Sequence, residues 1–354
     1  MPVTRIDPQY GAASGHNLRP TTCPCPIIFC TPQPPHTSHK AALQAHAPRH
    51  PSHRRQKVNL PADGQWQLLH IRGYNAHIFM RAMYALHHPH TIAKTKLTEI
   101  MAHYFITGAS SGIGAALVSR LLDDGHKVSA VARRATKLES LGATAGERFL
   151  ALPADVCDAD ALSAAIDRAN SAMGQIDVAI LNAGIYTPQN ALDIDPEIYR
   201  RHMDVNYMGV VNALPRLVDG MARASRGQIA MVSSVAGWRG LPKAAAYGPT
   251  KAALISLAES IHFDLAPKGI DVRVICPGFV ETEATAVNDY EMPGIISAAR
   301  AASEIVSGLK TDDFVIQFPR SFTRKMGLLR WLPDRAFFRL VGSRTGYGVQ
   351  RGGS

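Results

Sequence analysis

The chain has 354 residues, of which 46% are hydrophobic and 19% charged, a balance typical of a globular protein with a sizeable core. The net charge of +10 is uneven, because residues 1–100 hold 11 Lys and Arg against 3 Asp and Glu, whereas residues 101–354 hold 27 against 25. The nearly neutral larger part argues against nucleic acid as a partner. No apolar run approaches the ~18–20 residues of a membrane span, and no secretory signal opens the chain, so we expect a cytoplasmic location.

Residues 1–100 form a low-complexity segment with 12 of the 23 prolines and 11 of the 15 histidines. Because so many prolines prevent regular backbone hydrogen bonding, we expect this segment to be disordered. The one element that could form in it is a short helix at 78–86. Met101 directly precedes the first globular pattern. We therefore interpret Met101 as the natural start and residues 1–100 as an upstream extension of the reading frame. The basic patch at 53–57 leaves a targeting or nucleic-acid tail open as an alternative.

The cysteines give no sign of a metal site or a disulfide framework. They are Cys23, Cys25, Cys30, Cys157 and Cys276. The first three cysteines lack the paired spacing that places four ligands around zinc, and so do the histidines at 87, 88 and 90. The last two stand in apolar surroundings, which predicts free, buried thiols. We expect no metal.

A strand at 104–106, a glycine-rich turn at 107–114 and a helix at 115–122 follow one another. Glycines permit a tight turn and close backbone approach, and the helix N-terminus offers free N–H groups to a pyrophosphate. This context predicts a dinucleotide site. The cofactor-binding residues expected in the turn are Thr107, Gly108, Ser110, Ser111, Gly112, Ile113 and Gly114.

The second strand, at 127–132, ends in Arg133 and Arg134. In dinucleotide folds an acid at this end binds the adenosine ribose and repels a 2′-phosphate, whereas guanidinium groups match phosphate geometry. NADP(H) is therefore favoured over NAD(H). The alternative is a solvated basic pair at the start of a helix.

Two further strands complete the nucleotide half. The third, at 150–156, ends in Asp155 and Val156, where the adenine ring should lie; a helix is expected at 158–173. The fourth, at 177–184, ends in Asn182, Ala183 and Gly184, whose small side chains leave room for the cofactor. These strands are continuously apolar and alternate with helices, which predicts an α/β fold with a parallel sheet covered on both faces.

Tyr247 and Lys251 stand four residues apart at the start of a helix expected over 249–265. An ammonium beside a phenol favours the ionised form, so the pKa of the tyrosine should fall from about 10 toward neutrality. Ser234 lies 13 residues before the tyrosine, and its neighbour Ser233 is expected to be structural.

The glycine turn, the Asn-Ala-Gly motif at 182–184, Ser234 and the Tyr-x-x-x-Lys pair together resemble the short-chain dehydrogenase/reductase family, over about residues 101–320. The resemblance implies a single doubly wound Rossmann domain. It implies that Tyr247 is the general acid or base, that Lys251 lowers its pKa and binds the nicotinamide ribose, and that Ser234 binds the substrate carbonyl. Asn206 matches an asparagine that disturbs its helix and thereby holds a water in the proton relay.

The resemblance also extends to the second half of the domain. It implies cofactor contacts from Pro277, Gly278, Val280 and Thr282, with Thr282 at the nicotinamide carboxamide. It places a substrate loop at 283–297, where Tyr290 and Met292 are expected to touch the substrate. Pairing of the helices at 207–224 and 249–265 across a two-fold axis implies a homodimer or homotetramer.

Beyond the substrate loop we expect a helix at 298–309 and a last strand at 314–318. The C-terminal extension, 321–354, interleaves basic and apolar residues in two short helices broken at Pro333. We favour a lid over the site or a neighbouring subunit, with membrane-surface contact of 322–341 or disorder as alternatives.

The sequence as a whole predicts an NADP(H)-dependent oxidoreductase that interconverts a small-molecule carbonyl and an alcohol by hydride transfer. The alternative is a catalytically silent dinucleotide-binding regulator of the same fold.

Overall fold

The computed structural model describes residues 101–347. The expectations for residues 1–100, including those for their cysteines, histidines and short helix, lie outside the described residues. So do residues 348–354 of the C-terminal extension.

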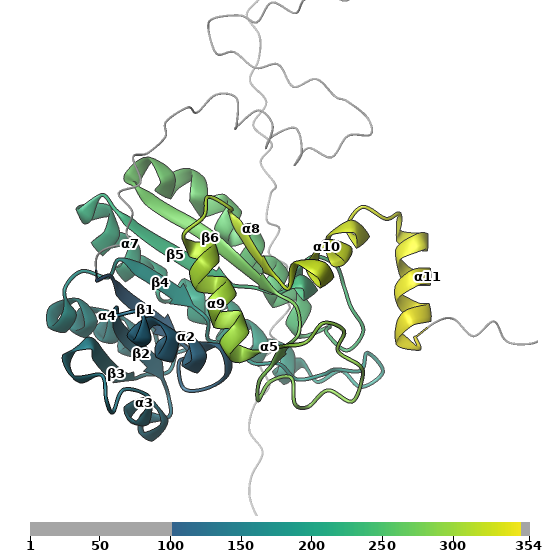
Figure 1. The fold of residues 1–354 in the computed structure, drawn as a ribbon. Helices are drawn as coiled ribbons and strands as arrows, with labels where there is room; N and C mark the ends of the chain where they lie inside the picture. The colour runs from purple at the N-terminus through teal and green to yellow at the C-terminus, as the bar shows by residue number, and fades with distance from the viewer. Residues whose placement is uncertain (1–100, 348–354) are drawn as a thin grey trace, which may run out of the picture. The chain divides into compact units, whose positions relative to one another are not determined.

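A seven-stranded sheet forms the centre of the fold (Figure 1), and its strands run in the order β3-β2-β1-β4-β5-β6-β9. All six neighbouring pairs are parallel. The strands are β1 (His103–Thr107), β2 (Lys127–Ala132), β3 (Phe149–Pro153), β4 (Val178–Leu181), β5 (Gly227–Val232), β6 (Ile270–Pro277) and β9 (Val315–Phe318). The order reverses at β1, so the chain is doubly wound, as predicted.

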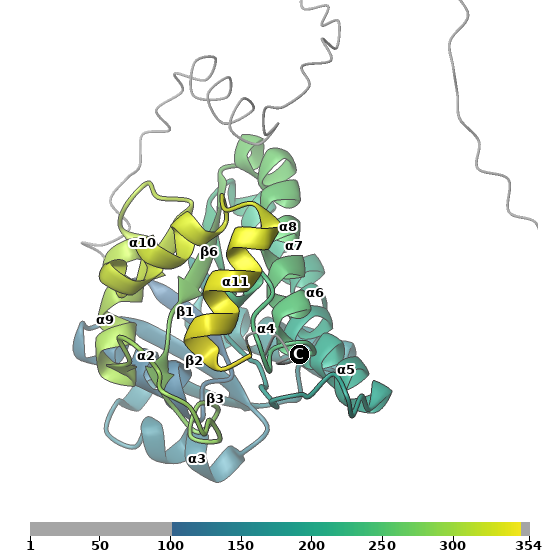
Figure 2. The ribbon, with the colours of Figure 1, turned by 90° about the vertical axis from the view of Figure 1, so that its right-hand side faces the viewer.

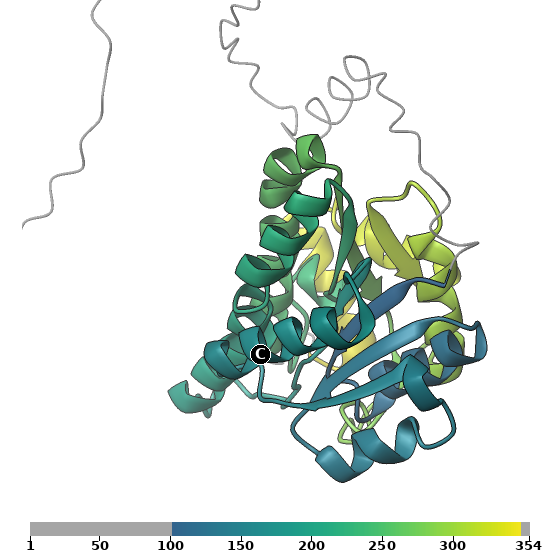
Figure 3. The same ribbon diagram turned by 90° about the vertical axis from the view of Figure 1, so that its left-hand side faces the viewer.

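Helices cover both faces of the sheet. One face packs against α2 (Gly112–Asp123), α3 (Ala135–Leu141) and α9 (Ala298–Leu309). The other packs against α4 (Ala159–Met173), α7 (Leu214–Ala224) and α8 (Tyr247–Leu265). The central strands β4 and β5 are buried along their whole length, which explains their continuous apolar sequences. Figure 3 gives the view from the side where the blue N-terminal strands of the sheet lie.

The helix expected over 207–224 is interrupted. The segment consists of α5 (Pro196–Met203), a π-helical turn η2 (Asp204–Met208), the single turn α6 (Gly209–Val211) and then α7. Pro215 has no N–H to donate and is accommodated only in a first helical turn, so α7 has to begin afresh at Leu214. The expectation of one continuous helix was wrong.

Three short 3-10 turns complete the connections: η1 (Gly146–Arg148), η3 (Val235–Gly237) and η4 (Ala266–Lys268). The third strand is also shorter than expected. It ends at Pro153, so Asp155 and Val156 lie in the loop that leaves the sheet.

The substrate loop is closed at its base by a second, two-stranded sheet. In it β7 (Val280–Glu281) pairs in parallel with β8 (Ile296–Ser297). The two ends of the loop are therefore held side by side, next to the carboxyl end of β6.

The C-terminal extension forms two helices, α10 (Arg320–Leu329) and α11 (Asp334–Thr345), separated at Pro333 as predicted (Figure 2). Arg239 holds them to the body, because it donates to the carbonyl oxygen of Leu332 at 3.0 Å, pairs with Asp334 at 2.7 Å and stacks 3.9 Å above the ring of buried Phe337. Within residues 101–347, no helix is long and apolar enough to cross a membrane.

Candidate active site

A cavity of about 720 Å³ opens at the carboxyl edge of the sheet. The loops that follow β1 to β6 all contribute to its wall, which is where a doubly wound sheet binds its ligand. The predicted residues that line it are Gly108, Ser110, Ser111, Gly112, Ile113, Arg133, Arg134, Asp155, Val156, Asn182, Ala183, Gly184, Ser234, Tyr247, Lys251, Pro277, Gly278, Val280 and Thr282.

Three predicted site residues, Thr107, Gly114 and Asn206, do not line the cavity and act from behind it. The Thr107 hydroxyl accepts hydrogen bonds from the backbone N–H groups of Asn182 (3.0 Å) and Ala183 (3.1 Å), which joins the ends of β1 and β4. A Cβ atom on Gly114 would lie 2.2 Å from the carbonyl oxygen of Gly108. Both residues therefore support the turn, and their direct contact with a cofactor stays a prediction.

The glycine turn fits the diphosphate of a dinucleotide. Gly108 and Gly112 have φ angles of +65° and +54°, which favour glycine, and a Cβ atom on Gly108 would lie 2.7 Å from the Cα of Ala183. Ser111 is the N-cap of α2, and within the described residues its side chain makes no capping hydrogen bond. The first N–H groups of α2 therefore face the cavity with the positive end of the helix dipole.

Tyr247 and Lys251 lie one turn apart on α8, and Tyr247 is the first residue of that helix. The Lys251 side chain is 3% exposed. Its Nζ donates to the carbonyl oxygen of Val232 at 2.8 Å and lies 5.5 Å from the centre of the Tyr247 ring. Ser233 donates to the carbonyl oxygen of Lys251 at 2.7 Å, the structural role expected of it.

Burial governs the protonation of this pair. It lowers the pKa of Lys251 to about 8 and raises the pKa of Tyr247 to about 12, although a hydrogen bond with Ser234 lowers the latter. The expected fall of the tyrosine pKa is therefore not found in this structure, because the loss of solvent around the phenolate is the largest effect on it. At neutral pH Tyr247 carries a proton that it can donate.

Ser234 stands at the start of η3, where its Oγ accepts a hydrogen bond from the backbone N–H of Ala236 at 3.1 Å. Because that bond uses a lone pair, the O–H of Ser234 can donate, in this structure to the phenol oxygen of Tyr247. The serine follows β5 and reaches the cavity beside Tyr247.

Asn206 belongs to the π-helical turn and is completely buried. Its Oδ1 accepts from the N–H of Ile185 at 2.7 Å, and its Nδ2 donates to the carbonyl oxygen of Ile185 (3.0 Å) and to the hydroxyl of Thr250 (3.1 Å). Gly184 separates it from Lys251, because a Cβ atom there would lie 3.3 Å from the Asn206 Oδ1 and 3.4 Å from the Lys251 Nζ. Asn206 thus fixes the loop after β4.

Aromatic side chains form the far end of the cavity. Tyr186 contacts the edge of the Tyr247 ring with centroids 5.2 Å apart, and Phe279 lies 6.2 Å from Tyr290 and 5.6 Å from Phe322. Tyr290 lines the cavity as expected, whereas Met292 does not and instead accepts a hydrogen bond from Asn288. This end suits an apolar group.

The sequence interpretation missed three of these aromatic residues. Tyr186 closely follows the Asn-Ala-Gly motif and Phe279 follows the Pro-Gly turn, so position offered a signal for both. Phe322 comes from α10, in the extension for which a lid over the site was favoured, but no local pattern marks this residue as part of the cavity.

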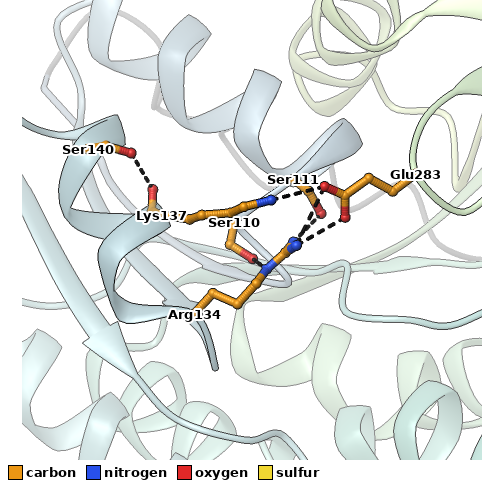
Figure 4. Close-up of polar contacts among 6 residues, drawn as sticks. All are labelled: Ser110, Ser111, Arg134, Lys137, Ser140 and Glu283. Carbon is orange, nitrogen blue, oxygen red and sulfur yellow. Dashed lines mark hydrogen bonds and ion pairs between the residues drawn. The ribbon is translucent and has the colours of Figure 1, made fainter.

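We call the part of the cavity next to the end of β2 the adenosine end, because the sequence predicts the adenosine of the cofactor there. Most of the charged side chains around the cavity lie at this end (Figure 4). Arg134 donates to the hydroxyls of Ser110 (3.0 Å) and Ser111 (2.7 Å) and pairs with Glu283 at 3.1 Å. Lys137, one turn into α3, pairs with the same carboxylate at 3.1 Å. Arg133 lies 3.8 Å from Asp155. Lys137 and Glu283 were not predicted, although Lys137 follows Arg134 at helical spacing.

Cys157 and Cys276 are free thiols, and only Cys276 is buried, which raises its pKa to about 12. In residues 101–347 no group of three or more His, Cys, Asp and Glu side chains could hold a metal ion.

A family model described as short chain dehydrogenase matches residues 102–292. The chain belongs to this family, the short-chain dehydrogenases/reductases. Members of the family are oxidoreductases that interconvert carbonyls and alcohols with a nicotinamide dinucleotide, so this short-chain dehydrogenase/reductase is an enzyme of that class.

Two curated relatives are similar along most of their length. An uncharacterized oxidoreductase of Myxococcus xanthus (strain DK1622) is 34% identical over 235 residues, which cover 66% of this chain and 93% of the relative. The 3-dehydrosphinganine reductase TSC10A of Arabidopsis thaliana is 34% identical over 257 residues, which cover 67% of this chain and 77% of the relative.

Solved structures give the same fold. A short chain dehydrogenase from Burkholderia cenocepacia J2315 in complex with NADP has a TM-score of 0.59 at 27% identity and covers 69% of this chain and 96% of its own. A 3-ketoacyl-(acyl-carrier-protein) reductase from Brucella melitensis complexed with NADH has a TM-score of 0.58 at 26% identity and covers 61% of this chain and 96% of its own. Similar chains therefore bind both forms of the cofactor.

Proposed function

We propose that this chain is an NADP(H)-dependent oxidoreductase that reduces an apolar carbonyl compound, or oxidises the corresponding alcohol, with Tyr247 as general acid or base. One observation carries the proposal: Tyr247, Ser234 and Lys251 meet on the wall of the cavity that also contains the glycine turn. The tyrosine phenol and the serine hydroxyl can both reach one substrate oxygen, beside the place where a dinucleotide would lie.

When bound, the cofactor supplies or accepts a hydride at its nicotinamide ring. In the reductive direction Ser234 donates a hydrogen bond to the substrate carbonyl oxygen, where negative charge develops. Tyr247 transfers its phenolic proton to that oxygen, which completes the alcohol. Lys251 sits beneath the phenol and stabilises the phenolate until a proton returns. In the oxidative direction Tyr247 accepts the proton of the alcohol instead.

The preference for NADP(H) over NAD(H) rests on the charge of the adenosine end. Arg133 and Arg134 line the cavity, and Lys137 pairs with Glu283 on its wall. The end of β2 carries no acid that would repel a 2′-phosphate. Because relatives bind both forms, the direct test is the ratio of kcat/KM with NADPH and with NADH. A ratio below one would overturn the preference.

The preference for an apolar substrate rests on the aromatic end of the cavity, where Tyr186, Phe279, Tyr290 and Phe322 surround the space next to Tyr247. Burial of an alkyl or aryl group there would supply binding energy, while Ser234 and Tyr247 fix the orientation of the polar atom. A series of ketones and aldehydes of growing apolar size should therefore show falling KM values.

The alternative function is that of a catalytically silent regulator, which would bind the dinucleotide without turnover. A panel of carbonyls and alcohols, followed by the absorbance of NADPH, separates the two. Turnover supports the enzyme, and tight NADPH binding without turnover of any compound supports the regulator.

Two further expectations concern the whole protein. From the family resemblance we propose a homodimer or homotetramer, which light scattering after gel filtration tests. We also propose a cytoplasmic location, which cell fractionation tests. Membrane-surface contact through α10 and α11 is the less favoured alternative, and it predicts co-sedimentation with anionic vesicles.

A further inference from the structure

The carboxylate of Glu283 lies in a site built for an anion (Figure 4). Arg134 and Lys137 each pair with it at 3.1 Å, from the loop after β2 and from α3. Arg134 also donates to the hydroxyls of Ser110 and Ser111 in the glycine turn, so the two serines hold the guanidinium in place. Two cations thus contact one negative side chain, and two hydroxyl groups position one of the cations.

Glu283 is held there by weak bonds. The side chains of Glu283, Lys137 and Arg134 are 59%, 50% and 42% exposed, and ion pairs at such exposure contribute little stability. A ligand with more charge and more acceptor oxygens can displace the carboxylate. A phosphate monoester has both, because it carries up to two negative charges and three acceptor oxygens.

Glu283 is also the first residue of the substrate loop, 283–297. It directly follows Thr282, and the Thr282 methyl group lies 3.0 Å from the position that a Cβ atom on Gly112 would occupy. The start of the loop therefore rests on the glycine turn while Glu283 is paired. The next residues form a turn in which the N–H groups of Thr285 and Ala286 both donate to the carbonyl oxygen of Thr282, at 3.1 Å.

We propose that Glu283 is a built-in competitor for the 2′-phosphate of the cofactor and thereby links the choice of cofactor to the substrate loop. The phosphate takes the site formed by Arg134, Lys137, Ser110 and Ser111, and the expelled carboxylate releases the start of the loop. NAD(H) has no group to expel it, so the loop stays tied to the glycine turn. The inference rests on the proposed preference for NADP(H) and assigns two residues to it, Lys137 and Glu283.

Binding of adenosine fragments tests the competition without catalysis. By titration calorimetry on the full chain, Glu283→Gln should bind 2′,5′-ADP about tenfold more tightly than the unmodified protein and bind 5′-AMP equally well. Lys137→Gln should weaken binding of 2′,5′-ADP alone. The matched control is Glu281→Gln, which removes an exposed carboxylate two residues earlier and should change neither affinity. Equal tightening for both fragments would overturn the inference.

Hydrogen exchange tests the link to the loop. In the unmodified protein 2′,5′-ADP should speed amide exchange at residues 283–289, whereas in Glu283→Gln exchange there should already be fast without ligand. Unchanged exchange in both cases would overturn the link.

The fragments also separate this inference from the proposed function. If 2′,5′-ADP binds more tightly than 5′-AMP but Glu283→Gln has no effect, the preference for NADP(H) stands and the competition fails. If 2′,5′-ADP binds no better than 5′-AMP to any of the proteins, both fail.

Discussion

The hydroxyl of Ser233 donates a hydrogen bond to the backbone carbonyl oxygen of Lys251 at 2.7 Å, and the serine side of this bond is only 1% exposed. The bond joins the end of β5 to the second turn of α8. Ser234, the next residue, faces the cavity instead. Two adjacent serines therefore have different tasks, one in holding the site together and one in the chemistry.

Substitution of the two serines should separate these tasks. Ser233→Ala removes a buried hydrogen bond and should lower the free energy of unfolding by about 1–2 kcal/mol. Ser234→Ala removes the donor at the developing oxyanion and should lower kcat by about 10²-fold, with a smaller loss of stability. Urea unfolding and steady-state kinetics of both variants check this. A larger kcat loss in Ser233→Ala than in Ser234→Ala would reverse the assignment.

Tyr247→Phe removes the phenolic oxygen and keeps the ring that contacts Tyr186. General acid–base groups contribute about 10²–10⁴-fold, so kcat should fall by at least about 10²-fold. The affinity for NADPH, measured by fluorescence titration, should stay within about twofold because the glycine turn is untouched. Retained turnover would remove Tyr247 from the proposed mechanism. The matched control Tyr290→Phe keeps Tyr247 and should raise KM more than it lowers kcat.

The lowered pKa of Lys251 predicts a specific dependence of stability on pH. Its pKa falls from 10.5 to about 8 on folding because the ammonium is buried. Between pH 8 and 10.5 the unfolded chain therefore binds a proton that the folded chain lacks, so this residue makes the free energy of unfolding rise as the pH rises. From pH 8 to pH 10.5, this residue raises the free energy of unfolding by about 3 kcal/mol in total.

The buried thiol of Cys276 and the buried phenol of Tyr247 titrate with the opposite sign, so the comparison needs a variant that changes the lysine alone. The stability difference between the wild type and Lys251→Met should shift in favour of the wild type by up to about 3 kcal/mol from pH 8 to pH 10.5. Urea unfolding at several pH values measures it. A difference that does not vary with pH would mean that Lys251 keeps its ordinary pKa.

Arg239 should control the attachment of the C-terminal helices. Arg239→Met loses the bonds to Leu332 and Asp334 and the stacking on Phe337, so α11 should be cleaved several-fold faster in limited proteolysis. The melting temperature of the whole domain should change little, because α11 lies outside the two main hydrophobic clusters. Arg335→Met, an exposed position on α11, serves as the control. Equal cleavage of both variants would mean that Arg239 does not hold the helix.

The sequence by itself determined those features of the fold and of the site that depend on residues close together in the chain. Continuous apolar strands between helices identified the doubly wound parallel sheet, since both faces of such a sheet are buried. Positive φ angles at Gly108 and Gly112 favour glycine, so the glycine turn was readable from composition and spacing. The four-residue spacing of Tyr247 and Lys251 places them one helical turn apart wherever that helix lies.

Only the tertiary structure decided what depends on contacts between distant segments. Glu283 reaches Arg134 across 149 residues of chain, and Phe322 enters the cavity from a helix that no motif marks. The π-helical turn that carries Asn206 bonds to Ile185 in the loop after β4 and to Thr250 on α8, and these segments are far apart in the sequence. The sign of the Tyr247 pKa shift was also beyond the sequence, because spacing gives the neighbouring charge but not the depth of burial. Burial is a property of the assembled fold, and in this site it has the largest effect on the pKa of Tyr247.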